Sequence, residues 1–173
     1  MTTHELKNLG VEKYWCPTKV ISGGQTGVDR AGLDAAIAAE IPIGGYCPKG
    51  RRSEDGAVPD RYPLVELANS GYKKRTERNV QESDGTLIVN TGTLSGGTLL
   101  TMRLAEKHQK PVFILNAEIP DICGVHRWGH ENAVRILNIA GPRENKTAGG
   151  IYDQAHQLLL ELLQPAVEGV THV

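Results

Sequence analysis

Val20-Ile21-Ser22-Gly23-Gly24-Gln25-Thr26-Gly27-Val28-Asp29-Arg30 is the segment from which the architecture of this chain can be inferred. Its first apolar residues predict a short buried strand, and the alanines from Ala31 onward recur at helical spacing. The glycines between strand and helix lack a Cβ, so the turn can adopt positive φ and a ligand can approach its backbone. Unpaired N–H groups and the positive end of the helix dipole favour an anion there. The segment therefore predicts a βα unit with an anion-binding turn.

The turn matches neither of the common nucleotide-binding motifs. It has no lysine where a P-loop needs one to reach the terminal phosphates, which disfavours hydrolysis of nucleoside triphosphates. It also departs from G-x-G-x-x-G, and no acidic residue follows a second strand to hold a ribose, so an NAD-dependent dehydrogenase is disfavoured. An ordinary tight turn without a ligand is the alternative to an anion site.

The length and charge of the chain limit its class. Its 173 residues suit a single domain, with a core at about 19–163, an N-terminal extension at 1–18 and a tail at 164–173. A net charge of −1 and a pI of about 6.6 argue against nucleic acid or a membrane surface as partner. No apolar run approaches the roughly 20 residues that span a bilayer, and the N-terminus has no signal-peptide core. We expect a soluble cytoplasmic protein.

Cysteine and histidine spacing predicts neither disulfides nor a metal site. The three cysteines, Cys16, Cys47 and Cys123, are widely spaced and odd in number, which fits a reducing compartment. His126 and His130 lie four apart, but Trp128-Gly129 separates them and a zinc site normally needs three or four ligands. We expect these histidines to be structural or exposed.

Apolar runs and helical patterns alternate along the rest of the chain. Expected strands lie at 41–46, 86–90, 110–115 and 136–140, and expected helices at 72–82, 99–108, 131–135 and from 151 onward. Residues 64–67 are ambiguous, 116–129 are expected to be irregular, and 1–18 to pack loosely. Such alternation predicts an α/β, Rossmann-like three-layer fold with a mainly parallel sheet and helices on both faces.

Glycine-rich loops follow three of these strands, at 22–27, 91–98 and 141–150. Loops that follow parallel strands emerge at one edge of the sheet, where ligands of open α/β sheets bind. We therefore expect the three loops to converge on one site. Pro142 should aim Arg143 into this crevice, because its φ is rigid. The breaker-rich stretch 47–63 should form a loop that covers the ligand; its cations Lys49, Arg51 and Arg52 either reach that ligand or form a solvated turn.

Several motifs together resemble a known family. They are Ser22–Asp34, Gly45-Tyr46-Cys47-Pro48-Lys49-Gly50-Arg51, Tyr72 with Arg75-Thr76, Ser83–Ile88, Gly96-Gly97-Thr98 and Asn138–Arg143. Over roughly Lys19 to Leu163 they resemble the molybdenum-cofactor carrier proteins, which are similar in fold to the LOG-type, "lysine decarboxylase-like" Rossmannoid proteins. The resemblance implies a cytoplasmic carrier that binds, protects and delivers the molybdenum cofactor (molybdopterin), an anionic pterin. It also implies a homo-oligomer, expected to be a tetramer, with molybdoenzymes or cofactor-biosynthesis proteins as candidate partners.

One departure bears on catalysis. LOG enzymes carry Pro-Gly-Gly-x-Gly-Thr-x-x-Glu, whose glutamate serves cleavage of a nucleotide's glycosidic bond, and Thr101 stands at the place of that acid here. We therefore expect no enzyme, no catalytic residue and no metal ligand, with a LOG-type phosphoribohydrolase as the alternative. Asp29 either complements the helix dipole or accepts a hydrogen bond from a pterin or base N–H. The candidate binding residues are Ser22, Gly23, Gly24, Gln25, Thr26, Gly27, Asp29, Arg30, Lys49, Arg75, Thr93, Ser95, Gly96, Gly97, Thr98, Gly141 and Arg143.

Overall fold

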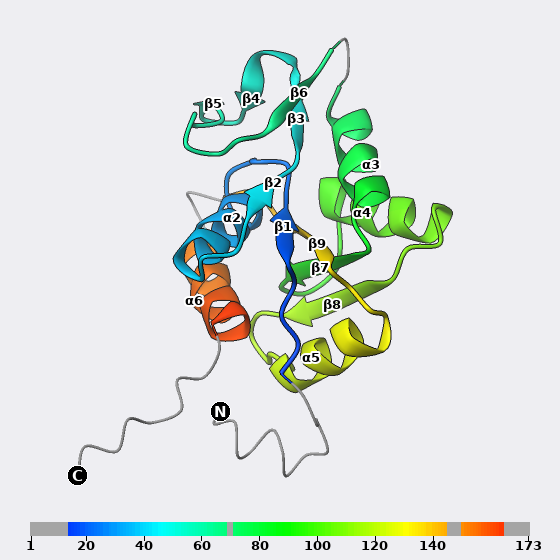
Figure 1. Cartoon of the computed structure of the whole chain (residues 1–173). Coiled ribbons are helices and arrows are strands. Elements are labelled where there is room, and N and C mark those ends of the chain that lie inside the picture. Colours follow the sequence, from blue (N-terminus) through cyan, green and yellow to red (C-terminus); the bar gives the residue numbers. More distant parts are fainter. Residues whose placement is uncertain (1–13, 69–70, 145–149, 165–173) are drawn as a thin grey trace, which may run out of the picture.

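The protein folds around a five-stranded parallel sheet with helices on both faces, as the alternation predicted (Figure 1). A computed structural model describes residues 14–68, 71–144 and 150–164. The strands of this sheet are β1 (Lys19–Ile21), β2 (Ile43–Gly44), β7 (Gly85–Asn90), β8 (Val112–Asn116) and β9 (Ile136–Ala140). The helices are α2 (Val28–Ala38), α3 (Tyr72–Glu82), α4 (Gly96–Lys107), α5 (Ile122–Glu131) and α6 (Ile151–Leu163). None of these described helices combines the length and the apolar composition needed to cross a membrane.

Two hydrophobic clusters divide the helices between the faces of the sheet. Buried residues of α2, α5 and α6 pack with inward-facing strand residues in the larger cluster, whereas Val80 of α3 packs with Leu104 and Ala105 of α4 in a smaller one. Figure 1 shows α2 and α6 on one side of β1 and the α3–α4 pair on the other. With both faces covered, β7 is buried along its whole length, which explains its unbroken apolar run.

The strand order places the last strand of the chain in the middle of the sheet. The order is β2-β1-β9-β7-β8, and β9 pairs in parallel with both β1 and β7. If β9 preceded β1 in the chain, this order would become 3-2-1-4-5, the order of a doubly wound dinucleotide-binding sheet. The sheet is therefore a doubly wound sheet whose first strand has moved to the C-terminal side. Its strand order reverses between β9 and β7.

Residues 46–67 form a small lobe rather than a loop without regular structure. It contains β3 (Tyr46–Pro48), the 3₁₀ turn η1 (Lys49–Arg51), β4 (Arg52–Ser53), β5 (Gly56–Ala57) and β6 (Val65–Leu67). β3 pairs with β6 in parallel, and β4 with β5 in antiparallel fashion. The ambiguous segment 64–67 thus contributes a strand. Tyr62 is fully buried. It belongs with Val58 and Leu64 to a hydrophobic cluster that packs the lobe against Leu33 of α2.

Two local expectations were wrong between β8 and β9. The segment expected to be irregular contains α5, whose first turn is capped by Asp121, since its carboxylate accepts from the N–H of Gly124 at 2.8 Å. Glycines weaken a helical pattern, but Gly129 is needed here because a Cβ would overlap the Trp15 indole. The short helix expected at 131–135 is absent: α5 ends at Glu131, and Ala133 has a φ of 48°.

The end of the N-terminal extension is part of the core rather than a loose tail. Trp15 is buried, and its Nε1 donates to the Val134 carbonyl at 2.7 Å. The Trp15 carbonyl in turn lies 3.0 Å from Nδ1 of His126, which is 1 % exposed. His126 is therefore a structural residue, while His130 is exposed. Residues 1–13 and the tail from 165 lie outside the described part of the chain.

Candidate functional site

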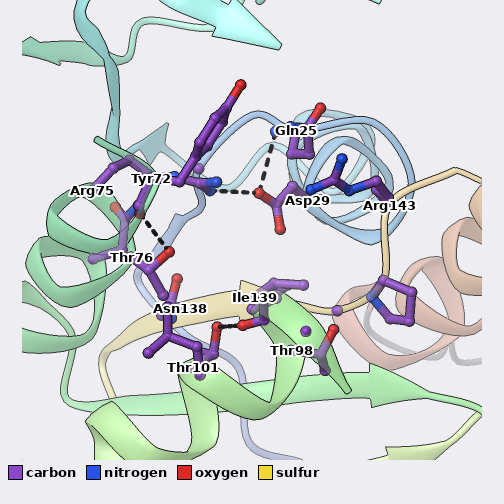
Figure 2. A pocket seen from close by; sticks show the side chains of 18 of the residues that line it. Gln25, Asp29, Tyr72, Arg75, Thr76, Thr98, Thr101, Asn138, Ile139 and Arg143 are labelled. Atoms are coloured by element: carbon purple, nitrogen blue, oxygen red, sulfur yellow. Dashed lines mark hydrogen bonds and ion pairs between the residues drawn. The ribbon is translucent and has the colours of Figure 1, made fainter. Parts of the chain in front are cut away.

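A cavity of about 550 Å³ lies at the carboxyl ends of the central strands (Figure 2). All three strand-end glycine loops contribute to it, through Gly23 and Gln25, through Ser95–Thr98 and through Ala140–Glu144. The convergence that we expected from the alternation is thus present in the structure. The cavity lies next to the β9–β7 boundary, where the strand order reverses and where doubly wound sheets bind ligands.

An ion pair between Arg75 and Asp29 lies in the wall of the cavity. Arg75 Nη1 is 3.1 Å from Asp29 Oδ2, and the two side chains are only 11 % and 8 % exposed. The backbone N–H of Gln25 donates to the same carboxylate oxygen at 3.2 Å. Burial raises the pKa of Asp29, and the Arg75 guanidinium opposes that rise. Arg75 was a candidate binding residue from the sequence, and the structure places its side chain, almost buried, in the wall of the cavity.

Gly23 makes room for this arginine. A Cβ on Gly23 would overlap Arg75 Nη1 and lie 2.6 Å from Cζ and 2.9 Å from Cδ. Gly23 is not among the residues of positive φ, so its missing side chain serves Arg75 rather than a special backbone conformation. The glycine turn is therefore what allows α3 to reach across to α2.

The other two glycines of this turn have the positive φ that the sequence predicted, 73° for Gly24 and 81° for Gly27. Their close neighbours are protein groups. A Cβ on Gly24 would lie 2.6 Å from Leu64 Cδ1, and one on Gly27 would lie 2.5 Å from the Pro142 carbonyl oxygen. Neither glycine lines the cavity. Their role in the structure is to let the turn pack against the small lobe and the third loop.

The remaining candidates fall into two groups. Gln25, Asp29, Arg75, Ser95, Gly96, Gly97, Thr98, Gly141 and Arg143 line the cavity with Gly23. Ser22, Thr26, Arg30, Lys49 and Thr93 do not line it. Ser22 Oγ donates to the Ile139 carbonyl at 2.7 Å, whereas Lys49 and Thr93 are exposed away from the cavity. Arg30 forms a two-pronged pair with Asp55, at 2.6 and 2.8 Å, which joins α2 to the small lobe.

The cations of the small lobe hold its own backbone. The Arg51 guanidinium donates to the carbonyls of Val58, Pro59, Tyr62 and Leu64 at 2.8–3.2 Å. Those contacts use its donors, so Arg51 neither lines the cavity nor belongs to a solvated turn. Arg52 Nε donates to the Lys49 carbonyl and is exposed. These two arginines of the small lobe therefore do not line the cavity.

The rim of the cavity ties the first and third loops to the small lobe. Thr26 Oγ1 donates to Glu54 Oε2 at 3.1 Å and accepts from the Glu144 N–H at 3.2 Å. Gln25 Oε1 accepts from the Glu54 N–H at 2.9 Å. Arg143, expected to point into the crevice, does line it, but its side chain is 62 % exposed and lies 3.8 Å from Glu54 Oε1. Arg143 therefore lies at the rim of the cavity, with most of its side chain in solvent. Residues 145–149 of this loop lie outside the described residues.

Several lining residues were absent from the candidate set. α3 contributes Tyr72, Thr76 and Asn79 with Arg75, at the i, i+3, i+4 and i+7 positions of one helix face. This spacing and the motif of Tyr72 with Arg75-Thr76 were the available signals, although so polar a helix face normally points to solvent. Asn138 and Thr101 also line the cavity and are 2 % and 4 % exposed. Asn138 lies in an otherwise apolar strand run and begins the motif Asn138–Arg143, so its polarity and that motif were the available signals.

The start of α4 lines the site with Gly96 and Gly97, whose N–H groups are among the first of the helix, while the Thr98 N–H donates to the Ser95 carbonyl. Its N-cap residue Ser95 makes no side-chain capping bond, and Gly96 and Gly97 have open space where a side chain would be. A helix N-terminus of this kind suits an anionic group. Thr101 Oγ1 donates to the Gly97 carbonyl at 2.9 Å, so the position of the LOG glutamate serves the helix backbone. No group of three or more histidine, cysteine or acidic side chains in the described ranges could hold a metal ion.

Comparison with known proteins agrees with this architecture. No curated protein matches the chain. Among solved structures, a "Putative molybdenum carrier protein" from Syntrophus aciditrophicus SB is 44 % identical, with a TM-score of 0.82 over 89 % of this chain and 99 % of that one. A family model, the circularly permutated YpsA SLOG family, matches residues 20–163. A circular permutation agrees with the strand order, because the central strand β9, which would come first in an ordinary doubly wound sheet, comes last in this chain. The chain therefore belongs to the circularly permutated YpsA family of SLOG proteins, which is related to the LOG-type proteins.

Proposed function

We propose that this protein is a carrier that binds the molybdenum cofactor, shields it and delivers it to a recipient. The observation that carries the proposal is a cavity that offers donors to an anionic ligand and lacks the LOG glutamate, although the carboxylates of Asp29, Glu54 and Glu144 also line it. The N-terminus of α4 offers backbone N–H groups, Arg75 offers a buried cation, and Thr101 occupies the position of the LOG glutamate. The solved relative named a molybdenum carrier points the same way.

The residues present fit such a ligand. A volume of about 550 Å³ lies within the usual range for small-molecule sites, about 300–1,000 Å³. Arg75 Nε is buried and has no hydrogen-bond partner among the described residues, so the site holds a donor that a ligand oxygen could satisfy. When bound, the cofactor would supply its own redox chemistry, and the protein would supply binding, orientation and cover.

The binding residues that we propose are the candidates that line the cavity: Gly23, Gln25, Asp29, Arg75, Ser95, Gly96, Gly97, Thr98, Gly141 and Arg143. The first glycine turn carries the binding residues Gly23 and Gln25, and its shape would depend on Ser22, Gly24, Thr26, Gly27 and Arg30. We also propose a cytoplasmic homotetramer that passes the cofactor to molybdoenzymes or receives it from cofactor-biosynthesis proteins. Light scattering of the purified protein tests the tetramer.

The experiment for the carrier is an anaerobic transfer assay. Purified protein is loaded with molybdenum cofactor, its dissociation constant is measured, and the complex is mixed with a cofactor-free molybdoenzyme. We expect saturable binding, slower oxidation of the bound cofactor than of the free one, and restored enzyme activity. Absence of binding would overturn the proposal.

A LOG-type phosphoribohydrolase is the second candidate function, favoured only by the shared SLOG architecture. Incubation with purine and cytokinin nucleoside monophosphates tests it directly. Catalytic release of free base would contradict the carrier and support the enzyme. We expect no turnover, because Thr101 cannot act as the acid–base residue that a glutamate provides.

A further inference from the structure

Asp29 has more hydrogen-bonding capacity than the protein itself uses. Its side chain is only 8 % exposed, yet it lines the cavity. Two N–H donors, from Gln25 and Arg75, both bind Oδ2, and a side-chain hydrogen bond from Ser22 also acts to lower the pKa of this carboxyl. An ionised carboxylate offers about four acceptor positions on two oxygens. Figure 2 shows the second oxygen of Asp29 directed into the open space of the cavity.

The surroundings hold this oxygen in a fixed place. Asp29 lies in the first turn of α2, Arg75 reaches it from α3, and Gly23 leaves the space through which Arg75 passes. Both side chains are nearly buried, so neither can turn to solvent without breaking the pair. A buried acceptor that is charged and immobile selects strongly for N–H donors and against oxygen lone pairs.

The anion-binding features lie elsewhere in the same cavity. The N-terminus of α4, at Ser95–Thr98, and Asp29 belong to different helices, and Figure 2 shows Thr98 and Asp29 on opposite sides of the space. A ligand that fills the cavity therefore meets a backbone donor end and a carboxylate end. Such a ligand carries negative charge at one end and N–H donors at the other.

We propose that Asp29 is the specificity residue of this site and accepts the N–H donors of a 2-amino-4-oxopyrimidine ring, the donor edge shared by pterins and guanine. This inference rests on the proposed carrier function and assigns the pterin end of the ligand to Asp29. Arg75 is a positioning residue that holds the carboxylate. Adenine presents an acceptor nitrogen beside a single amino group and suits Asp29 less well. A ring that carries oxygen in place of the 2-amino group would set an acceptor against the carboxylate, which is itself an acceptor.

The test compares two matched rings. Pterin and lumazine differ in whether the 2-position carries an amino group or an oxygen, and binding of each is measured by calorimetric titration. We expect the wild type to prefer pterin by about ten- to hundredfold, the range for a hydrogen bond to a charged group. Asp29→Asn should bring the ratio to within about threefold of one, because an amide can donate to the 2-oxygen.

Asp34→Asn is the matched control, since Asp34 is a part-buried acid on the same helix whose partners are Arg61, Tyr62 and Tyr152 outside the cavity. It should keep the wild-type ratio. If Asp29→Asn unfolds because Arg75 is left unpaired, Asp29→Asn with Arg75→Gln removes that charge and gives the same ratio test.

A folded Asp29→Asn protein that still prefers pterin would overturn the inference, as would a wild type without preference. A wild type that binds the molybdenum cofactor but does not distinguish the two rings refutes only the role of Asp29. A wild type that prefers pterin but fails the transfer assay supports Asp29 and refutes the carrier.

Discussion

Replacing Gly23 by alanine should destabilise the protein through Arg75 rather than through the turn itself. The new Cβ would overlap Arg75 Nη1 and lie 2.6 Å from Cζ, so the guanidinium must leave its place beside Asp29. Breaking a buried ion pair costs about 3–5 kcal/mol, and we expect about 3 because the displaced arginine can turn into the open cavity. For a domain of this size that corresponds to a Tm lowered by about 6–12 °C.

The assay is thermal unfolding of four proteins: wild type, Gly23→Ala, Arg75→Ala and the double variant. If the cost passes through Arg75, Gly23→Ala should be nearly neutral once Arg75 is gone, with a coupling free energy of about 2–3 kcal/mol. Gly97→Ala is the matched control, because nothing lies within 4 Å of its Cβ position, and it should be neutral or stabilising by up to about 1 kcal/mol. Equal destabilisation by Gly23→Ala in both backgrounds would refute this reasoning.

Three further predictions concern the core, the pH dependence and the rim. Trp15→Ala should cost about 3–5 kcal/mol in the free energy of unfolding, measured in urea, because the ring is buried and its N–H is bonded to Val134; a smaller loss than 1 kcal/mol would mean that the N-terminal segment is dispensable. Burial lowers the pKa of His126, so the unfolded chain takes up a proton first as pH falls below about 6.5, and stability present above that pH is lost. Urea titrations at pH 7 and pH 5 should show a larger loss for the wild type than for His126→Gln, and equal losses would contradict it. Arg143→Ala should weaken molybdenum-cofactor binding by less than about fivefold, since exposed ion pairs contribute about 0–1 kcal/mol, whereas Arg75→Gln should weaken it by more than tenfold; anaerobic titration at two salt concentrations measures both, and the reverse ranking would place the main cation at the rim.

The fold could be predicted where the sequence signal is local. The turn at 22–27 carries two of its three glycines, Gly24 and Gly27, at positions of positive φ, and the apolar run at 86–90 identifies a strand covered on both faces. α5 escaped prediction because Gly124 and Gly129 interrupt its pattern, and the reason for Gly129 lies in Trp15, over a hundred residues earlier. The contact between Gly129 and Trp15 can be recognised only in the folded structure.

The site was harder to predict because the surroundings of an arginine depend on residues outside its own turn or helix. Arg51 stands in a charged turn, yet four carbonyls of residues 58–64 surround its guanidinium. Arg75 stands on a polar helix, yet it is buried against Asp29, 46 residues away in sequence. The partners of Arg51 lie 7–13 residues along the chain and the partner of Arg75 lies 46 residues away, so neither composition nor helical spacing identifies them.

Strand order explains how motifs at opposite ends of the chain form one cavity. β9 lies between β1 and β7, so its carboxyl end emerges beside the first glycine turn although it comes last in the chain. The two loops are then joined directly: the Val28 N–H donates to the Pro142 carbonyl at 3.1 Å, and Thr26 bonds the backbone of Glu144, 118 residues away. A ligand in this cavity meets a surface determined by which strands are neighbours. Moving one strand from the start to the end of the chain leaves those neighbours unchanged, and so it can preserve the site.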